Sequence, residues 1–224
     1  MSSTQKGHRD RLRQKLDERG LDGFSDQEIF EYFLFAINAR RDTKPIVKAC
    51  FARFKTLEGI LKAPPDKLKQ VTGLGDETIR YLNLIVALLD RLSFQRLESV
   101  NVISNWKDLE YYCIQKLAFQ PIEKFMMITL DNQNQVTKVK DFGEGTINQM
   151  TVYPREVLKV ALAADAVSVI LVHNHPSKDK RASRQDIAMT KSLQTILQSA
   201  NIKLLDHVII AGGTCVSLKA QGLF

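Results

Sequence analysis

The stretch Ala166–Ser177, AVSVILVHNHPS, decides the fold of the second half of the chain. Its apolar, β-branched residues up to Val172 are typical of a buried strand. A proline and a serine then end that strand. Because side chains alternate along a strand, His173 and His175 point to the same side. The stretch therefore predicts two imidazoles at a strand end that solvent or a substrate can reach.

The chain around this stretch alternates between strand and helix patterns. We expect further strands at residues 125–130, 135–142, 202–210 and 214–218, and helices at residues 106–119, 154–163 and 183–200. Residues 131–134 are turn formers and join the first two strands as a hairpin. The second half is therefore predicted to be an α/β domain with a mixed sheet.

The first half has a helical period throughout. Apolar residues recur at spacings of three and four from residue 6 to about residue 99, without a convincing alternating strand. Breaks at residues 20–23, 38–43, 63–65 and 73–75 divide this part into about five short helices. We therefore place a helical domain at residues 1–100 and the α/β domain at residues 101–224.

The composition is that of a globular protein. A chain of 224 residues with 44% hydrophobic residues can bury a core. The formal net charge of +7 allows an acidic partner such as nucleic acid, but it also fits an ordinary solvated surface. Three widely spaced cysteines predict neither a disulfide framework nor a thiolate metal site. The longest apolar runs are too short to span a bilayer, so we expect a cytoplasmic protein without a membrane partner.

Asp186 joins the histidine pair as a third candidate ligand. It follows His175 by eleven residues and lies in the first helical turn, where the helix dipole favours a carboxylate. Two imidazoles and one carboxylate suit Zn²⁺, and three protein ligands leave a fourth position for water, as in catalytic sites. Zinc lowers the pKa of that water to about 7. An accidental histidine pair is the alternative, but the three residues together predict a mononuclear zinc site that performs hydrolysis.

The chain resembles a known family. The sequences HNHPS at residues 173–177 and SRQD at residues 183–186 are similar to the H-x-H-P and S-x-x-D pattern of the JAB/MPN (JAMM) metalloproteases. The first of them, followed by LDH at residues 205–207, resembles more narrowly the bacterial RadC family. GHRDRLR at residues 7–13 and RRDTKP at residues 40–45 also look like that family, so the likeness covers nearly the whole chain. It implies a JAB/MPN-like, cytidine-deaminase-like α/β domain behind the helical one.

The resemblance also assigns roles to the candidate residues. It implies that His173, His175 and Asp186 are the zinc ligands. It implies that Ser183 helps to stabilise the oxyanion through its hydroxyl. Position alone gives Ser183 a second role as the N-cap of a helix, with Asp186 completing a capping box. The two roles are compatible.

JAMM enzymes further use a glutamate near the metal, which takes the proton of the water and passes it to the leaving amine. Glu123, just before the strand predicted at residues 125–130, is the best match. Glu110, Glu144 and Glu156 are the alternatives. Glu156 is also explained as a first-turn helix residue, and Glu144 as a turn residue between two glycines.

The chain departs from the RadC pattern at two positions. Lys178 stands where a glycine is usual after HNHPS, and Ala182 stands where a proline is usual before the S-x-x-D serine. These changes leave the ligands intact. They affect the shape of the loop and substrate access, and Lys178 adds to a basic rim with Lys180, Arg181 and Arg184.

The sequence VTGLG at residues 71–75 is similar to the hairpin of a helix-hairpin-helix motif. There Gly73 and Gly75 would let the backbone approach a DNA phosphate at the next helix N-terminus. A glycine in a helix connection is also explained by its left-handed backbone. The basic N-terminus supports DNA contact, with five cations opposed only by Asp10: Lys6, Arg9, Arg11, Arg13 and Lys15. A helical protein-docking module is the alternative for this half.

These features together predict a zinc-dependent JAMM-type hydrolase that cleaves peptide or isopeptide bonds in a peptide or protein substrate. The competing hypothesis is a DNA-binding repair or recombination accessory with a structural or weakly active zinc site. A metal-dependent nuclease is a third. His207, after Asp206, is interpreted as a structural residue or one that supports a ligand rather than as a ligand itself.

Overall fold

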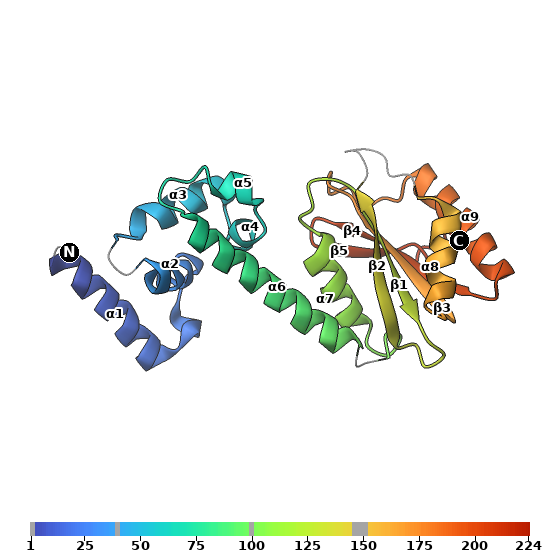
Figure 1. The fold of residues 1–224 in the computed structure, drawn as a ribbon, viewed down its shortest axis with the longest axis horizontal. Coiled ribbons are helices and arrows are strands. Elements are labelled where there is room, and N and C mark those ends of the chain that lie inside the picture. The colour runs from blue at the N-terminus through green and yellow to red at the C-terminus, as the bar shows by residue number, and fades with distance from the viewer. Residues whose placement is uncertain (1–2, 39–40, 99–100, 145–151) are drawn as a thin grey trace. The chain divides into compact units, whose positions relative to one another are not determined.

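The computed structural model describes residues 3–38, 41–98, 101–144 and 152–224. The chain forms two compact units, Met1–Leu89 and Asp90–Phe224 (Figure 1). The predicted domain boundary at residue 100 lies outside the described residues, as do Arg40 of the RRDTKP motif and the side chain of Lys6.

The first unit is built from helices. They are α1 (Ser3–Arg19), the 3₁₀ helix η1 (Leu21–Gly23), α2 (Asp26–Ile37), α3 (Lys44–Phe54), α4 (Leu57–Leu61), α5 (Pro65–Leu68) and α6 (Asp76–Glu98), which continues into the second unit. All four predicted breaks separate helices. The periodicity missed a fifth break at Lys55, which has a φ of 71° and ends α3. None of the helices in the described ranges has the length and apolar content of a membrane span.

Part of the basic N-terminus is used inside this unit. The Arg9 guanidinium donates to the carbonyls of Asn38 and Arg41, at 2.6 and 2.7 Å, just beyond the end of α2. Lys15 donates to both carboxylate oxygens of Glu28 at 2.7 and 2.9 Å. These two cations therefore stabilise the helical unit, and their charge is not wholly available to a DNA phosphate.

The two glycines of the VTGLG hairpin differ in whether the structure requires a glycine at that position. Gly73 has a φ of +95°, and a Cβ there would lie 2.8 Å from Cγ1 of Ile46. Gly75 has a backbone that other residues adopt, and nothing lies within 4 Å of a Cβ built there. Turn geometry and packing against α3 thus explain Gly73, as the helix-connection interpretation predicts.

The second unit is a mixed α/β domain, as predicted. Its elements are α7 (Trp106–Leu117), β1 (Lys124–Leu130), β2 (Val136–Glu144), α8 (Pro154–Ala163), β3 (Ser168–Asn174), α9 (Arg184–Ser199), β4 (Lys203–Ala211) and β5 (Thr214–Ser217). The strand order is β2-β1-β3-β4-β5. Only the β3–β4 pair is parallel among the described strands. The fold thus has β3 in the middle of the sheet, buried along its whole length.

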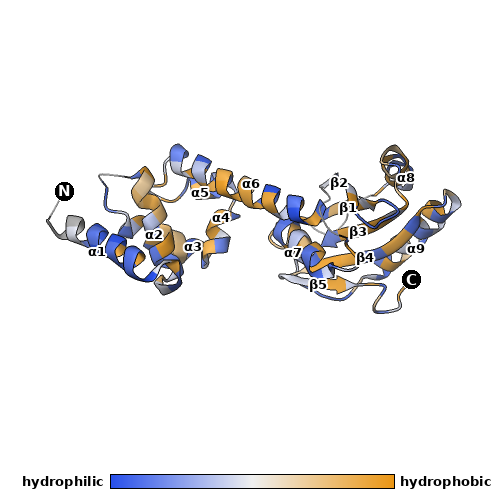
Figure 2. Cartoon of the chain, turned by 90° about the horizontal axis from the view of Figure 1, so that it is seen from below, coloured by the Kyte–Doolittle hydropathy of each residue, from blue (hydrophilic) through white to orange (hydrophobic). Residues whose placement is uncertain are grey.

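Helices cover both faces of this sheet. One apolar core joins α7 to one face, and a second core joins α8 and α9 to the other face (Figure 1). The central strands are correspondingly hydrophobic (Figure 2). Val169 and Leu171 of β3 belong to the core under α8 and α9. Because side chains alternate, His173 points to that same face.

A β-bulge changes the facing of residues along β4. Val169 pairs with Leu204, but the next residue, Ile170, pairs with Asp206, so Leu205 is an extra residue in β4. Strict alternation from Leu204 would turn residue 207 away from α9. The extra residue shifts the alternation of side chains along β4 by one position. His207 consequently faces α9 beside Leu171.

Candidate metal centre

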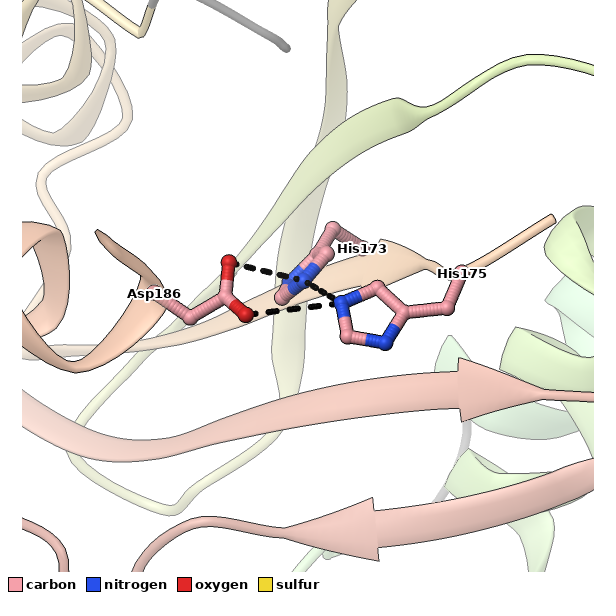
Figure 3. A group of neighbouring side chains, drawn as sticks. All are labelled: His173, His175 and Asp186. Carbon is pink, nitrogen blue, oxygen red and sulfur yellow. Dashed lines mark hydrogen bonds and ion pairs between the residues drawn. The ribbon is translucent and has the colours of Figure 1, made fainter. Parts of the chain in front are cut away.

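The three candidate ligands meet where β3 ends and α9 begins. His173 is the next-to-last residue of β3, His175 follows the strand, and Asp186 lies in the first turn of α9 (Figure 3). The main-chain amide of His175 donates to the Ile210 carbonyl at 2.9 Å, which holds the second histidine against β4 after the strand has ended. The sheet and the helix N-terminus thus bring the side chains together from residues far apart in the chain.

The ligand atoms have the spacing of a metal site. His173 Nε2 lies 3.0 Å from His175 Nε2 and 3.3 Å from Asp186 Oδ1. His175 Nε2 lies 3.4 Å from Asp186 Oδ2. Donors held tetrahedrally at zinc distances are roughly 3.3 Å apart. Within the described residues this is the only such group of histidine, cysteine and acidic side chains, and its ligand atoms all lie within 4.8 Å of one another.

One ligand has its ring orientation fixed by a backbone carbonyl. His175 Nδ1 lies 2.8 Å from the carbonyl oxygen of Asp179. A carbonyl only accepts, so Nδ1 carries a proton and the neutral ring presents the lone pair of Nε2 to the other ligands. This is the tautomer that binds a metal through Nε2. The donor set therefore fits zinc.

Electrostatics keep the third ligand ionised. Burial raises the pKa of Asp186, but the contacts of its carboxylate with the His173 and His175 imidazoles outweigh that effect and hold its pKa well below the ordinary value. The same carboxylate raises the pKa of His175, because it stabilises the protonated form of the ring. The charges at this site are thus complementary, with a carboxylate available to a cation.

Ser183 and Asp186 form the predicted capping box at the start of α9. Ser183 Oγ accepts from the amide of Asp186 at 3.1 Å, and Asp186 Oδ2 accepts from the amide of Ser183 at 2.7 Å. The Ser183 hydroxyl proton is not used in this cap. Ser183 also lines the cleft described next, so its hydroxyl can donate there.

A cleft of about 940 Å³ opens over His173, His175 and Asp186. Its lining includes Glu123, which precedes β1, whereas Glu110 and Glu156 do not line it, and the side chain of Glu144 lies outside what the structure describes. Glu123 also contributes to the raised pKa of His175 through its charge. Glu156 instead lies 3.6 Å from Arg155 in the first turn of α8. Of the three candidate glutamates whose side chains are described, the geometry thus brings Glu123 to the site.

The walls of the cleft differ in character. One set of lining residues is apolar: Phe125, Val152, Pro154, Met189 and Leu193. Arg181 and Arg184 line it from the predicted basic rim, but Lys178 and Lys180 do not. Arg181 is paired with Asp179, and this bond lowers the pKa of that carboxyl. Beside its acidic groups, the cleft therefore offers apolar surface and one cation, Arg184, for which no carboxylate partner is found among the described residues.

The loop from β3 to α9 explains one departure from the RadC pattern. Lys178 has a φ of +63°, the left-handed region that favours glycine. Its amide donates to the His175 carbonyl at 2.9 Å and closes a turn directly after the histidine pair. Glycine adopts such a backbone without strain, and Lys178 adopts it in this chain.

A buried network of hydrogen bonds lies behind the candidate ligands, and only part of it was predicted from the sequence. His207 is fully buried and contacts both His173 and Thr190, and the burial lowers the pKa of its imidazole well below the usual value. The Asp206 carboxylate accepts hydrogen bonds from the hydroxyl of Ser217 and the amide of Lys219, which ties β4 to the end of β5 and to the segment after it. Thr190 was not among the residues predicted from the sequence, although its position one helical turn after Asp186 was a usable signal.

Comparison with known proteins agrees with this architecture. The family model described as the RadC-like JAB domain matches residues 103–223. A UPF0758 protein of Rhodobacter capsulatus is 36% identical over 212 residues, which cover 95% of this chain and 99% of that protein. A UPF0758 protein of Fusobacterium nucleatum is 36% identical over 224 residues, with 97% of each chain covered.

Proposed function

Because this chain belongs to the RadC-like JAB domain family, we propose that it is a zinc-dependent JAMM-type hydrolase that cleaves peptide or isopeptide bonds. The observation that carries the proposal is the convergence of His173, His175 and Asp186 within 4.8 Å on an open cleft. Glu123 lines the same cleft without belonging to the ligand group. Three ligands, an open side and a separate carboxylate are what metal-assisted hydrolysis requires.

Different residues of the chain have different roles in the proposed hydrolysis. When bound, zinc polarises a carbonyl and lowers the pKa of a coordinated water toward 7. The Glu123 carboxylate takes the proton of the attacking water and returns it to the nitrogen of the leaving amine. The Ser183 hydroxyl donates to the oxygen of the scissile carbonyl as its negative charge develops. Asp186 balances the metal charge.

The cleft wall supports a peptide as the substrate. Phe125, Met189 and Leu193 offer apolar contact beside the ligands, which suits a hydrophobic side chain next to the scissile bond. Arg184 offers a cation at the rim for a substrate carboxylate or a carbonyl.

The first test is the metal content of the purified full chain, measured by elemental mass spectrometry without added metal. We expect about one zinc per chain, and loss of it in His175→Ala and Asp186→Ala while circular dichroism shows an intact fold. A wild-type protein that holds no zinc even after reconstitution contradicts the proposal.

The second test concerns the reaction. A library of peptides and isopeptide-linked peptides is incubated with the zinc-loaded chain, and products are read by mass spectrometry. Glu123→Gln should keep its zinc and lose at least about 100-fold in rate, the range of a positioned acid–base group. Glu156→Gln is the matched control and should keep full rate, because Glu156 does not line the cleft. Equal loss in both variants argues against Glu123 as the acid and base.

A further inference from the structure

We propose that Thr190 and His207 are positioning residues that fix the tautomer of His173, so that the Nε2 lone pair of His173 faces the metal position. The inference rests on the proposed zinc site and deepens it. It gives a role to two buried side chains that touch neither the cleft nor a substrate.

The chain of hydrogen bonds starts at a group that can only accept. Thr190 Oγ1 lies 2.6 Å from the main-chain carbonyl oxygen of Asp186, one helical turn earlier. Two oxygens at that distance repel each other unless a hydrogen lies between them. The single hydroxyl proton of Thr190 therefore points to the carbonyl.

The direction of the Thr190 hydrogen bond decides which nitrogen of His207 is protonated. Thr190 Oγ1 also lies 2.6 Å from His207 Nδ1. Since the hydroxyl proton is already committed, Oγ1 can only accept here, and Nδ1 of His207 must carry the proton. His207 is fully buried between a hydroxyl and another imidazole, an environment that disfavours a charged ring. A neutral ring protonated at Nδ1 has a bare Nε2.

The contact between His207 and His173 decides the tautomer of the candidate ligand His173. His207 Nε2 lies 2.8 Å from His173 Nδ1. Because this Nε2 is bare, His173 Nδ1 donates to it, and the Nε2 of a neutral His173 is left with a lone pair. That atom is the one that lies 3.3 Å from Asp186 Oδ1 and 3.0 Å from His175 Nε2 (Figure 3).

If the hydrogen bonds ran in the opposite direction, His173 would present a proton to the metal position in place of a lone pair. If the Thr190 proton pointed to His207, then His207 would donate to His173, and the proton of His173 would sit on Nε2. That proton would occupy the place of the metal. The two directions are distinguishable because they assign opposite tautomers to both histidines.

The two ligand histidines thus receive their orientation in different ways. His175 is fixed directly by the Asp179 carbonyl, whereas His173 is fixed through two side chains by the Asp186 carbonyl. Asp186 therefore acts twice, with its carboxylate as a ligand and with its main-chain oxygen as the start of the chain. The bulge in β4 makes this possible because it turns His207 toward α9.

The first experiment compares zinc affinity by competition with a chromophoric chelator. Thr190→Val keeps the shape and removes the hydroxyl, and we expect a 10- to 100-fold weaker affinity. Thr190→Ser should bind as the wild type does. Thr195→Val is the matched control, because Thr195 makes the same bond to the Lys191 carbonyl on the exposed side of α9. Thr190→Val that folds and binds zinc like the wild type overturns the proposal.

The second experiment needs no variant. The chain has four histidines, so long-range ¹H–¹⁵N spectra of the labelled, zinc-loaded full chain resolve each tautomer. We expect His173 and His207 both protonated at Nδ1, and His207 protonated at Nε2 overturns the proposal. A wild type without zinc contradicts the proposed function, and the tautomer of His207 in the same sample still decides the hydrogen-bond chain. Zinc binding without peptide cleavage leaves both experiments readable.

Discussion

Ser183 and Asp186 cap the start of α9 reciprocally, each accepting a hydrogen bond from the amide of the other. The carboxylate that caps the helix is also the one that faces His173 and His175. The position of the candidate metal ligand therefore depends on the stability of one helix N-terminus.

Ser183→Ala removes one half of this cap. We expect the free energy of unfolding to fall by about 1 kcal/mol, because the Asp186 amide loses its acceptor. Zinc affinity should fall as well, since the first turn that carries Asp186 is less well held. Urea denaturation and zinc competition measure the two effects. Ser183→Thr keeps the hydroxyl and should match the wild type in both, so a defect in the threonine variant would point to another cause.

Glu28→Gln should lower stability in a pH-dependent way. The hydrogen bond from Lys15, followed by that from the amide of Ser25, lowers the pKa of Glu28 from 4.5 to about 2. A carboxyl with a depressed pKa stabilises the fold fully above its unfolded pKa and loses that effect as the pH falls toward its folded pKa. The wild type should therefore exceed Glu28→Gln by about 1 kcal/mol at pH 7, and the difference should shrink between pH 4.5 and 2.

Urea denaturation followed by circular dichroism at pH 7 and pH 3 measures this difference. The exposed pair of Asp10 and Arg13 supplies the control. Asp10→Asn should change stability by less than about 0.5 kcal/mol at either pH, because solvent screens such a pair. A difference for Glu28→Gln that stays constant with pH contradicts the prediction.

Gly73→Ala should destabilise the helical unit by at least about 2 kcal/mol. The new Cβ adds strain at a φ of +95° and meets the Ile46 side chain at 2.8 Å. Gly75→Ala is the matched comparison and should stay within about 1 kcal/mol of the wild type, because its site is open. Thermal unfolding of the two variants tests this, and equal midpoints would contradict the packing role of Gly73.

Substitution of Lys178 tests the turn after the histidine pair. Lys178→Gly should be neutral or stabilising by up to about 1 kcal/mol, because a φ of +63° is unstrained for glycine. Lys178→Val should destabilise by about 1–2 kcal/mol, because a β-branched residue fits that backbone poorly. Chemical denaturation of both variants checks the order glycine, lysine, valine. A valine variant as stable as the glycine variant would contradict it.

The sequence by itself determined the elements and the candidate ligands. Helices and strands were predictable because their apolar faces repeat with a local period, as in α9, or because they form a β-branched apolar run, as in β3. The pairing of His173 with His175 was predictable for the same reason, since alternation along one strand is a local property. Asp186 was predictable from its spacing after the pair and its place in the first turn of a helix, and the resemblance to the JAMM enzymes supplied the roles of Ser183 and Glu123.

Only the tertiary structure decided which distant residues meet. A single extra residue in β4 turns His207 toward Thr190 and His173, and strict alternation from Leu204 predicts the opposite facing. Gly73 is required by Ile46, which comes from another helix of the same unit. Such contacts depend on strand register and helix packing. Register and packing are decided by the burial of whole faces of the sheet and helices. They leave no local period in the sequence from which such contacts can be predicted.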